Sequence, residues 1–385
     1  MKTIVSIVLN NFKNDSRVLK TNISLQNTGY RVQVVALWEN DIDEFEIIQN
    51  IPVHRVKLKS KNWSKNKLVQ LIKYFEFLYK VSKKYKDADI LHCNDLNALP
   101  IGYIVKKFFN KNIKIVYDAH EYETQKNGLK GIQKTLTKIL EKFLIKYANK
   151  VITVSDAIAD EYVRLYNIPK PALVLNTPPF KQIEKKDIFR ETFNISKDST
   201  IFLYQGALTK GRGIEILLKT FKQLSKQPIT NNQYTNIPII IFMGYGVLEK
   251  DIIEASKEYK NIYFHQAVSP DILLDYTSSA DFGISTIEDS CLSYRYCLPN
   301  KMFEYTMANV PVIVSNLPQM KKVVEKYQIG IVAKENTMQG LQEAIKKATT
   351  LDKNILQDNI QKVQKIYNWE EQEKVLLKVY KGLEL

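Results

Sequence analysis

The feature that most constrains the fold is an alternation of short apolar runs with amphipathic runs, which occurs twice along the chain. In the first half the apolar runs are rich in Val and Ile, and amphipathic runs such as 67–85 lie between them. Strands that alternate with helices form a parallel sheet covered by helices on both faces. The predicted strands of the first half are 3–9, 31–37, 53–58, 88–95, 113–121 and 150–155.

The alternation stops at residues 176–200, where paired prolines and mixed charges indicate a linker, and then resumes. A chain of 385 residues is also too long for one ordinary core. We therefore predict an α/β protein of two doubly wound, Rossmann-like domains, in which ligands bind at the carboxyl ends of the strands. The predicted strands of the second half are 200–208, 237–244, 262–268, 281–286 and 310–315.

The composition is that of a globular protein, with 45% apolar and 25% charged residues. There is no run of 18 apolar residues, so no membrane-spanning helix is expected. The N-terminal apolar run has no small-residue cleavage site and is interpreted as a strand rather than a signal peptide. Cys93, Cys291 and Cys297 lack zinc-ligand spacing and are too few for a disulfide framework, which favours a reducing cytoplasm.

Positive charge is concentrated in one part of the chain. The net charge is +15, and residues 51–150 alone carry 22 Lys and Arg against 8 Asp and Glu. A basic surface of this kind favours an anionic partner, such as membrane lipid, a phosphorylated acceptor or nucleic acid.

A glycine-rich loop, "GALTKGRG" (206–213), follows the first strand of the second half and precedes a helix. Gly206, Gly211 and Gly213 permit a tight turn, and the loop carries Lys210 and Arg212. Backbone N–H groups at a helix N-terminus favour an anion, so the loop could hold a diphosphate; a solvated basic turn is the alternative. After the next strand, Gly244 and Gly246 could admit a nucleobase or ribose, or form a plain turn.

A second polar feature is a short helix that begins near "LPNKMFEY" (298–305). Pro299 suits a helix start, Asn309 suits a left-handed exit and Pro311 prevents continuation. Glu304, one turn inside, could accept hydrogen bonds from two vicinal sugar hydroxyls. The alternative is an acid that only stabilises the helix dipole.

Taken together, these segments resemble the GT-B glycosyltransferases of glycosyltransferase family 4 (group 1), a retaining group that uses nucleotide sugars. The resemblance rests on the ordered set "LYQGALTKGRGIEILL", "IIIFMGYG", "SSADFGIST", "LPNKMFEYTMANVPVI" and "YNWEEQEKVLLKVY", with "VYDAHE" and "VITVSDAIADEY" in the first half. It implies an acceptor-side domain at 1–180, a donor-binding domain at 181–366 and a last helix, 367–385, that packs back on the first domain.

The resemblance also implies residue roles. Glu304 matches the acid that binds the ribose hydroxyls, Arg212 and Lys210 match the diphosphate loop, and His120 matches the acceptor-domain histidine that faces the donor sugar. Catalytic roles are expected for His120, Arg212 and Lys210. Donor-binding roles are expected for Gly206, Gly213, Gly244, Tyr245, Gly246, Asn300, Lys301 and Glu304, and acceptor or sugar contacts for Asn11, Arg17, Asp95, Glu121 and Tyr296.

The implied reaction is transfer of a hexose from a UDP or GDP sugar to a hydroxyl of a glycan or lipid-linked acceptor, in bacterial surface-polysaccharide assembly. No metal or cofactor is expected, and the enzyme would be cytoplasmic, on the inner face of the membrane. Two alternatives remain: a non-catalytic subunit that binds nucleotide sugar, and a sugar-nucleotide epimerase of the same fold.

Two departures from the family pattern stand out. Many members have a Glu-x7-Glu motif, and here Tyr296 stands at the first position. The usual glycine-rich loop after the first strand is replaced by "NNFKNDSR", in which side chains of Asn10, Asn11, Asp15 and Arg17 could serve instead. Both departures bear on sugar specificity.

Residues 130–150 form an amphipathic helical pattern with a lysine at every fourth position. We interpret its apolar stripe as core. The lysines are either a solvated face or a contact to anionic lipid, and we favour peripheral membrane contact through residues 51–150. Nucleic acid is not expected, because no binding motif accompanies the charge. The apolar stripe consists of Ile132, Leu136, Ile139, Leu140, Phe143, Leu144 and Tyr147.

Overall fold

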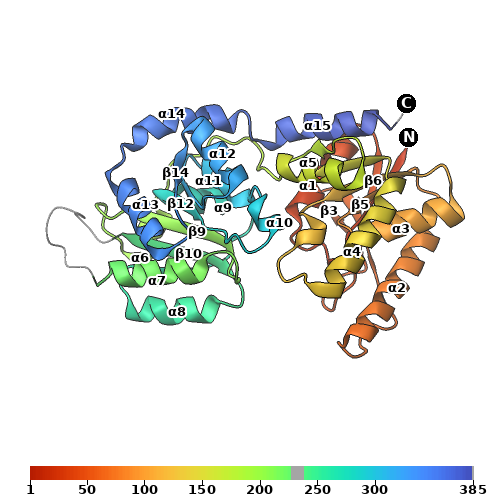
Figure 1. Cartoon of the computed structure of the whole chain (residues 1–385), viewed down its shortest axis with the longest axis horizontal. Helices are drawn as coiled ribbons and strands as arrows, with labels where there is room; N and C mark the ends of the chain where they lie inside the picture. The colour runs from red at the N-terminus through yellow and green to blue at the C-terminus, as the bar shows by residue number, and fades with distance from the viewer. Residues whose placement is uncertain (227–237, 384–385) are drawn as a thin grey trace. The chain divides into compact units, whose positions relative to one another are not determined.

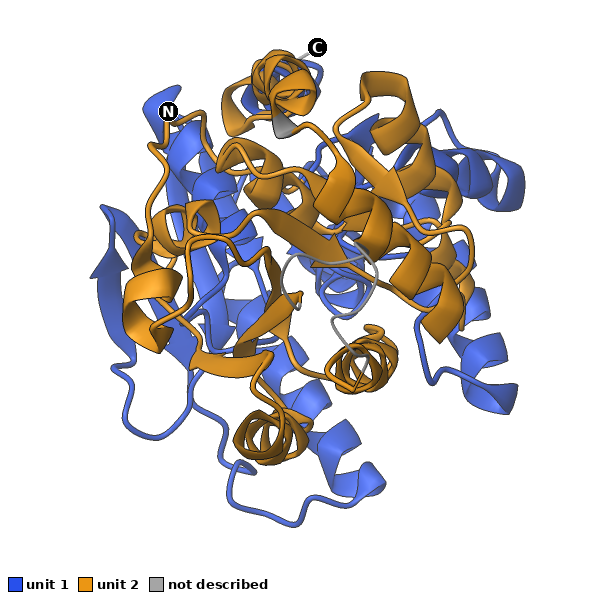
Figure 2. Cartoon of the chain, turned by 90° about the vertical axis from the view of Figure 1, so that its left-hand side faces the viewer, with its two compact units in different colours: residues 1–175, 373–385 blue, residues 176–372 orange. Residues whose placement is uncertain are grey.

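The computed structural model describes residues 1–226 and 238–383 (Figure 1), and within these ranges no helix is long and apolar enough to cross a membrane. Ile237 and residues 384–385, assigned above to a strand and to the last helix, lie outside the described residues. The chain divides into unit 1, Met1–Leu175 with Glu373–Leu385, and unit 2, Asn176–Gln372 (Figure 2). These boundaries lie a few residues from those expected at 180 and 367.

The strands of unit 1 form one sheet in the order β3-β4-β2-β1-β5-β6-β7-β8. Neighbouring strands are parallel except β3 and β4, which pair antiparallel at one edge. The sequence analysis did not identify β3, which lies in an acidic loop. The strands are β1 (Thr3–Ile7), β2 (Arg31–Leu37), β3 (Phe45–Ile48), β4 (Ile51–Val56), β5 (Ile90–Asn94), β6 (Lys114–Ala119), β7 (Lys150–Thr153) and β8 (Ala172–Leu173).

Three helices of unit 1, those that begin after Asp15, Asn66 and Ser155, start where the sequence supplies a capping side chain. Asp15, Asn66 and Ser155 each accept a hydrogen bond from a backbone N–H of the first helical turn. The helices are α1 (Ser16–Asn27), α2 (Lys67–Lys84), α3 (Leu99–Ile104), the π-helix η1 (Val105–Phe109), the 3-10 turns η2 (Glu123–Gln125) and η3 (Ile145–Tyr147), α4 (Gly131–Leu144) and α5 (Asp156–Tyr166). The last helix, α15 (Trp369–Lys381), begins in unit 2 and ends in unit 1.

Unit 2 contains a parallel sheet in the order β11-β10-β9-β12-β13-β14. Its strands are β9 (Ile201–Ala207), β10 (Ile239–Tyr245), β11 (Ile262–Gln266), β12 (Phe282–Ser285), β13 (Val312–Val314) and β14 (Gly330–Val332). Its helices are α6 (Ile188–Phe193), α7 (Ile214–Leu224), α8 (Glu249–Glu258), α9 (Leu273–Ser278), α10 (Leu292–Arg295), α11 (Asn300–Met307), α12 (Pro318–Tyr327), α13 (Met338–Thr350) and α14 (Lys353–Gln364).

Both sheets reverse their strand order at one point, which positions the polar side chains described below. In unit 1 the chain builds outward from β1 on one side and then continues from β5 on the other; in unit 2 the same reversal separates β9 from β12. In open α/β sheets, ligands bind at the carboxyl ends of the strands at such a point. The prediction of two doubly wound α/β domains is confirmed.

One prediction about the core is wrong. Of the apolar stripe of α4 and the turn after it, only Leu144 is buried, whereas Ile132, Leu136, Ile139 and Phe143 are exposed. The helix is turned so that Glu141 points inward, where its carboxylate accepts hydrogen bonds from three tyrosine hydroxyls. Only one side of α4 can face the core. Because that side carries Glu141, the apolar stripe on the other side is left in solvent. The three tyrosines are Tyr117, Tyr162 and Tyr166.

Candidate functional site

The glycine-rich loop of unit 2 is held in place by contacts that only glycine permits. Gly213 begins α7 with φ of 73°, and a Cβ on it would lie 2.0 Å from the carbonyl oxygen of Thr286, after β12. A Cβ on Gly244 would lie 1.9 Å from the carbonyl oxygen of Gly206. The carboxyl ends of β9, β10 and β12 therefore meet closely at this loop, as a phosphate-binding backbone requires.

Two cations lie beside this loop. The Lys301 ammonium lies 3.6 Å from the centre of the Tyr204 ring, and it is the nearest group to the space where a Gly206 side chain would stand. The Arg212 guanidinium lies 4.9 Å from the Tyr294 ring. Burial, and then repulsion from Arg212, lower the pKa of Lys301 to about 7. Two cations held together in this way favour binding of an anion.

Glu304 is held at the end of β9. Its carboxylate accepts a 2.6 Å hydrogen bond from the side-chain amide of Gln205, whose carbonyl oxygen accepts from the Thr277 hydroxyl. The Tyr305 hydroxyl accepts from the backbone N–H of Gln205, which ties α11 to β9. Asn309 has a φ of 60°, so the left-handed exit predicted for this helix is present.

The other residues predicted in unit 2 vary in exposure. Lys210 is exposed on the loop, Asn300 is exposed at the first position of α11, and the Tyr245 side chain is 65% exposed at the end of β10. Tyr296 is half-buried at the end of α10. The backbone N–H of Glu288 donates to the carbonyl of Gly211, which places this acid beside the loop. Gly246, next to Tyr245, packs against the Leu208 backbone.

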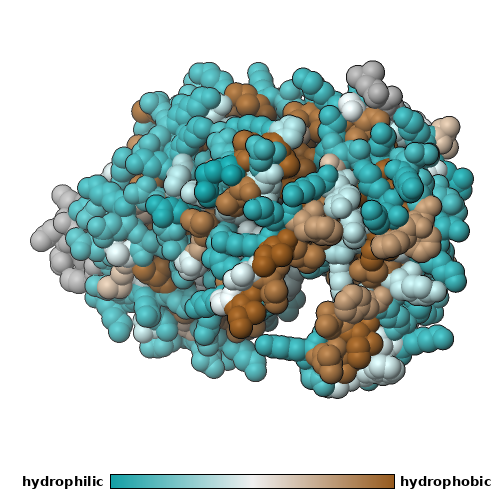
Figure 3. All heavy atoms as spheres, turned by 45° about the vertical axis from the view of Figure 1, so that its right-hand side comes forward, coloured by the Kyte–Doolittle hydropathy of each residue, from teal (hydrophilic) through white to brown (hydrophobic). Residues whose placement is uncertain are grey.

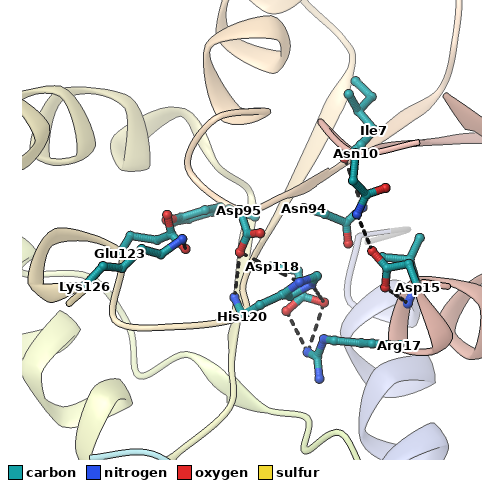
Figure 4. Close-up of polar contacts among 12 residues, drawn as sticks. Ile7, Asn10, Asp15, Arg17, Asn94, Asp95, Asp118, His120, Glu123 and Lys126 are labelled. Atoms are coloured by element: carbon teal, nitrogen blue, oxygen red, sulfur yellow. Dashed lines mark hydrogen bonds and ion pairs between the residues drawn. The ribbon is translucent and has the colours of Figure 1, made fainter. Parts of the chain in front are cut away.

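The polar centre of unit 1 lies at the ends of β5 and β6 (Figure 4). His120 lies between two carboxylates: its Nε2 is 3.4 Å from Asp118 and its Nδ1 is 3.8 Å from Asp95. Its backbone N–H also donates to Asp95, which has a φ of 63°. Burial alone would lower the pKa of His120, but the two carboxylates outweigh it and the pKa is raised.

Asp118 is the buried hub of this centre. Arg17 donates to both of its oxygens, at 2.7 and 3.0 Å, and also to the carbonyl of Val174. His92 lies 3.4 Å from the same carboxylate and contacts the hydroxyl of Tyr380 from α15 through its other nitrogen. Burial raises the pKa of Asp118, but Arg17 and His120 hold it well below its usual value.

A second acid accompanies Asp95. Glu123 is buried, and burial and the charge of Asp95 raise its pKa to about 9, although Lys126 lies 2.9 Å away. Glu121, the acid that was predicted here, is exposed instead. Glu123 lies in the 3-10 turn η2, whose three residues are all buried, and the sequence alone did not show which of the two acids turns inward.

The loop after β1 uses its side chains to satisfy its own backbone. The side-chain amide of Asn10 donates to Asp15, and its carbonyl oxygen accepts from the backbone N–H of Phe12. The side-chain amide of Asn11 donates to Glu39, and its carbonyl oxygen accepts from the backbone N–H of Lys13. Arg17 is the predicted residue of this segment that reaches the polar centre. Asn11 contacts Glu39 rather than His120.

Three residues of these centres were missed as candidates. Asp118 lies two positions before His120, so alternation along β6 could have placed both side chains on one face. Gln205 is the last buried residue before Gly206, and Glu123 carries no local signal. In the described ranges no cluster of three His, Cys, Asp or Glu side chains could hold a metal ion.

Two family models match the chain. The model described as "Glycosyltransferase Family 4" matches residues 20–177, and the one described as "Glycosyl transferases group 1" matches residues 185–365. Their order along the chain coincides with the two units, and the second match includes the loop at Gly206–Gly213 and Glu304.

Similar proteins are found among characterised sequences and solved structures. A chitobiosyldiphosphodolichol beta-mannosyltransferase of Debaryomyces hansenii is 24% identical, covering 89% of this chain and 78% of its own. Sucrose-phosphate synthase of Thermosynechococcus elongatus superimposes with a TM-score of 0.80 at 17% identity, covering 100% of this chain and 99% of its own. The Anabaena protein HepE in complex with UDP-glucose superimposes with a TM-score of 0.71 at 14% identity, covering 100% of this chain and 100% of its own.

Proposed function

Since the chain belongs to the group 1 glycosyltransferases of GT-B fold, we propose that it transfers a hexose, with retention of configuration, to a lipid-linked glycan in bacterial surface-polysaccharide assembly. Membership of this family makes the chain a glycosyltransferase that uses a nucleotide sugar. The proposal concerns the sugar, the acceptor, the stereochemistry and the pathway.

The observation that carries the proposal is the pair of cations at the end of β9. Lys301 and Arg212 lie beside the glycine-rich loop and the N-terminus of α7, where the leaving diphosphate of the donor would gain negative charge. Lys210, exposed on the same loop, would reach the outer phosphate. These cations supply positive charge at the leaving group, so we propose transfer without a metal or another cofactor.

Glu304 would bind the ribose. Its carboxylate accepts a hydrogen bond from Gln205, and a carboxylate can accept several hydrogen bonds, as binding of two vicinal hydroxyls requires. The backbone of Gly244–Gly246, where Tyr245 is exposed, would lie against the base. UDP and GDP sugars are the two donors that we propose to compare.

Retention is supported by the state of His120. Asp118 and Asp95 raise the pKa of His120 and so favour its protonated form, which cannot act as a base on the acceptor hydroxyl. We propose instead that His120 donates a hydrogen bond to the donor sugar and that the leaving phosphate accepts the acceptor's proton.

The acceptor proposal has support from the relatives. Two of them, from Debaryomyces hansenii and Candida albicans, are chitobiosyldiphosphodolichol beta-mannosyltransferases, whose name describes a lipid-linked glycan. We propose an acceptor of this class, reached from the cytoplasmic face of a membrane that the basic residues 51–150 approach.

The experiment is a transfer assay in which the purified chain, a panel of UDP and GDP hexoses and a lipid-linked acceptor are combined and the product is analysed by NMR. Retention gives the donor's anomeric configuration in the product. Inversion would contradict the retaining mechanism and require a base for the acceptor hydroxyl.

The site is tested with the double variant Lys210→Ala/Arg212→Ala. Turnover should fall by at least about a hundredfold, because one such donor to a developing charge contributes roughly 2.7–4 kcal/mol. Lys219→Ala, an exposed lysine on α7, is the matched control. Near-normal turnover in the double variant would mean that this loop does not hold the diphosphate.

A further inference from the structure

Two helices of unit 1 present apolar faces to solvent. Along α4 these are Ile132, Leu136, Ile139 and Phe143, and along α2 they are Leu68, Leu71, Ile72, Phe75 and Tyr79. Both sets recur at helical spacing, so each forms a continuous stripe. Both helices pack beside α3, and Phe108 and Phe109 of η1 are exposed in the same region of the chain.

Figure 3 shows apolar atoms gathered over α4 and over α2 on the face turned toward the viewer. Large exposed apolar patches on a protein surface mark sites of contact with proteins, ligands or membranes.

The orientation of α4 is fixed from the inside. Glu141, its single acid, is fully buried against Tyr117, Tyr162 and Tyr166. Turning the apolar stripe into the core would move this carboxylate into solvent and leave three buried hydroxyls without their acceptor, which is costly. The exposed stripe is therefore a stable feature of the fold.

The charge around these stripes has one sign. Lys130 is exposed just before α4, and Lys138, Lys142 and Lys146 are exposed on α4 and the turn after it. On α2, Lys67 and Lys83 are exposed. The acids of the two helices are engaged elsewhere: Glu141 is buried, and Glu76 binds Ser60 and Lys80. In the described part of these two helices, lysines but no exposed carboxylates border the apolar surface.

We propose that the apolar faces of α2 and α4 insert into the interface of an anionic lipid bilayer, with the lysines beside them at the headgroups, and hold unit 1 on the membrane. This deepens the proposed function and rests on it for the lipid-linked acceptor. Amphipathic helices with lysines beside an apolar face lie in the bilayer interface in this way.

Charge complementarity favours a bilayer over a second copy of the chain. A twofold symmetric dimer would place the same patch on both sides of the interface, and so lysine against lysine. Anionic headgroups would instead neutralise the lysines while the acyl region takes the apolar side chains.

The test is co-sedimentation of the full chain with vesicles of phosphatidylcholine alone or mixed with phosphatidylglycerol. The chain should bind the anionic vesicles and should keep part of this binding in about 1 M salt, where charges are screened beyond roughly 3 Å. Trp63, 54% exposed just before α2, should shift its fluorescence to shorter wavelength on binding.

The decisive variant is Ile132→Gln/Ile139→Gln, at positions 79% and 60% exposed. Partitioning should fall by at least about tenfold, because moving each side chain from water into hydrocarbon changes a partition coefficient by about that factor. The matched control is Ile47→Gln/Ile355→Gln, at positions 72% and 65% exposed outside these helices, which should bind like the parent chain. Lys138→Gln/Lys142→Gln should lose the preference for anionic vesicles.

Three outcomes would overturn the inference: unchanged binding of Ile132→Gln/Ile139→Gln, complete loss of parent binding in high salt, or dimerisation in light scattering without vesicle binding. The affinity for UDP and GDP, measured in each variant, distinguishes a failure of the membrane proposal from a failure of the proposed function. Failure of nucleotide binding in the parent chain would count against the proposed function, whatever the vesicles show.

Discussion

At the residue scale, two half-buried cationic side chains differ in how they are neutralised. His120 lies between Asp118 and Asp95, which raise its pKa, whereas Lys301 lies on an aromatic ring near Arg212, which lowers its pKa. The positive charge of His120 is balanced by these carboxylates within unit 1. Glu304 offsets the charge of Lys301 only in part, and a bound anion would balance it further, which makes donor binding sensitive to pH.

Donor affinity should therefore fall as pH rises above about 7. In the free protein Lys301 loses its proton near that pH, and a bound diphosphate would favour the charged form, so binding takes up a proton. The loss should approach tenfold per pH unit until the pKa of the complex is reached. Calorimetry in buffers of different ionisation enthalpy measures the uptake directly. Lys301→Met should abolish it, and a pH-independent affinity of the parent chain would contradict the assignment.

Glu304→Gln should weaken nucleotide binding by about one to two powers of ten, because a hydrogen bond to a charged group contributes roughly 1.5–3 kcal/mol. The fold should persist, since the new side-chain carbonyl can still accept from Gln205. Calorimetric titration with UDP and GDP measures the loss, with Glu325→Gln, an exposed acid on α12, as control. Unchanged affinity would remove Glu304 from the site.

At the scale of elements, α4 shows that a single buried contact can decide which face of a helix is exposed. The carboxylate of Glu141 accepts hydrogen bonds from the hydroxyl of Tyr117 on β6 and from the hydroxyls of Tyr162 and Tyr166 on α5. These bonds anchor the helix to β6 and α5.

Glu141→Gln should lower the stability of unit 1 by about 1–3 kcal/mol, because the amide NH₂ cannot accept from a tyrosine hydroxyl and one buried donor loses its partner. A urea titration of the full chain measures the change. Tyr79→Phe, which removes an exposed hydroxyl on α2, is the control and should be nearly neutral. Equal stability of Glu141→Gln and the parent chain would show that the cage does not hold α4.

At the scale of the whole molecule, the chain crosses between the units twice, after Leu175 and after Gln372. The second crossing lies within α15. Its start is bound in unit 2, where the N–H of Trp369 donates to Pro178, and its end is bound in unit 1, where the Tyr380 hydroxyl contacts His92.

Tyr380→Phe should lower the unfolding transition of unit 1 and leave that of unit 2 in place. The ring keeps its packing on Tyr30, but buried His92 loses a hydrogen-bond partner at a cost of about 1–3 kcal/mol. Differential scanning calorimetry resolves the two transitions if the units unfold separately. Equal shifts of both would mean that they unfold as one.

The sequence by itself determined the two parallel sheets, the order of the elements and the local geometry of the donor loop. Alternation of apolar runs, glycines after β9 and the Asn309 exit from α11 are local features, and local sterics and periodicity are enough to interpret them. Elements that it did not identify, among them β3, β8, β14, α13 and α14, lie outside the motifs on which the prediction was based.

Only the tertiary structure decided which side chains meet. Gln205 with Glu304, Arg17 with Asp118, and His92 with Tyr380 are each far apart along the chain. It also decided that Glu123 turns inward rather than Glu121, and that α4 buries Glu141 and exposes its apolar stripe. Periodicity shows that a helix has two faces, but which of them is buried depends on the partners that the fold brings beside it.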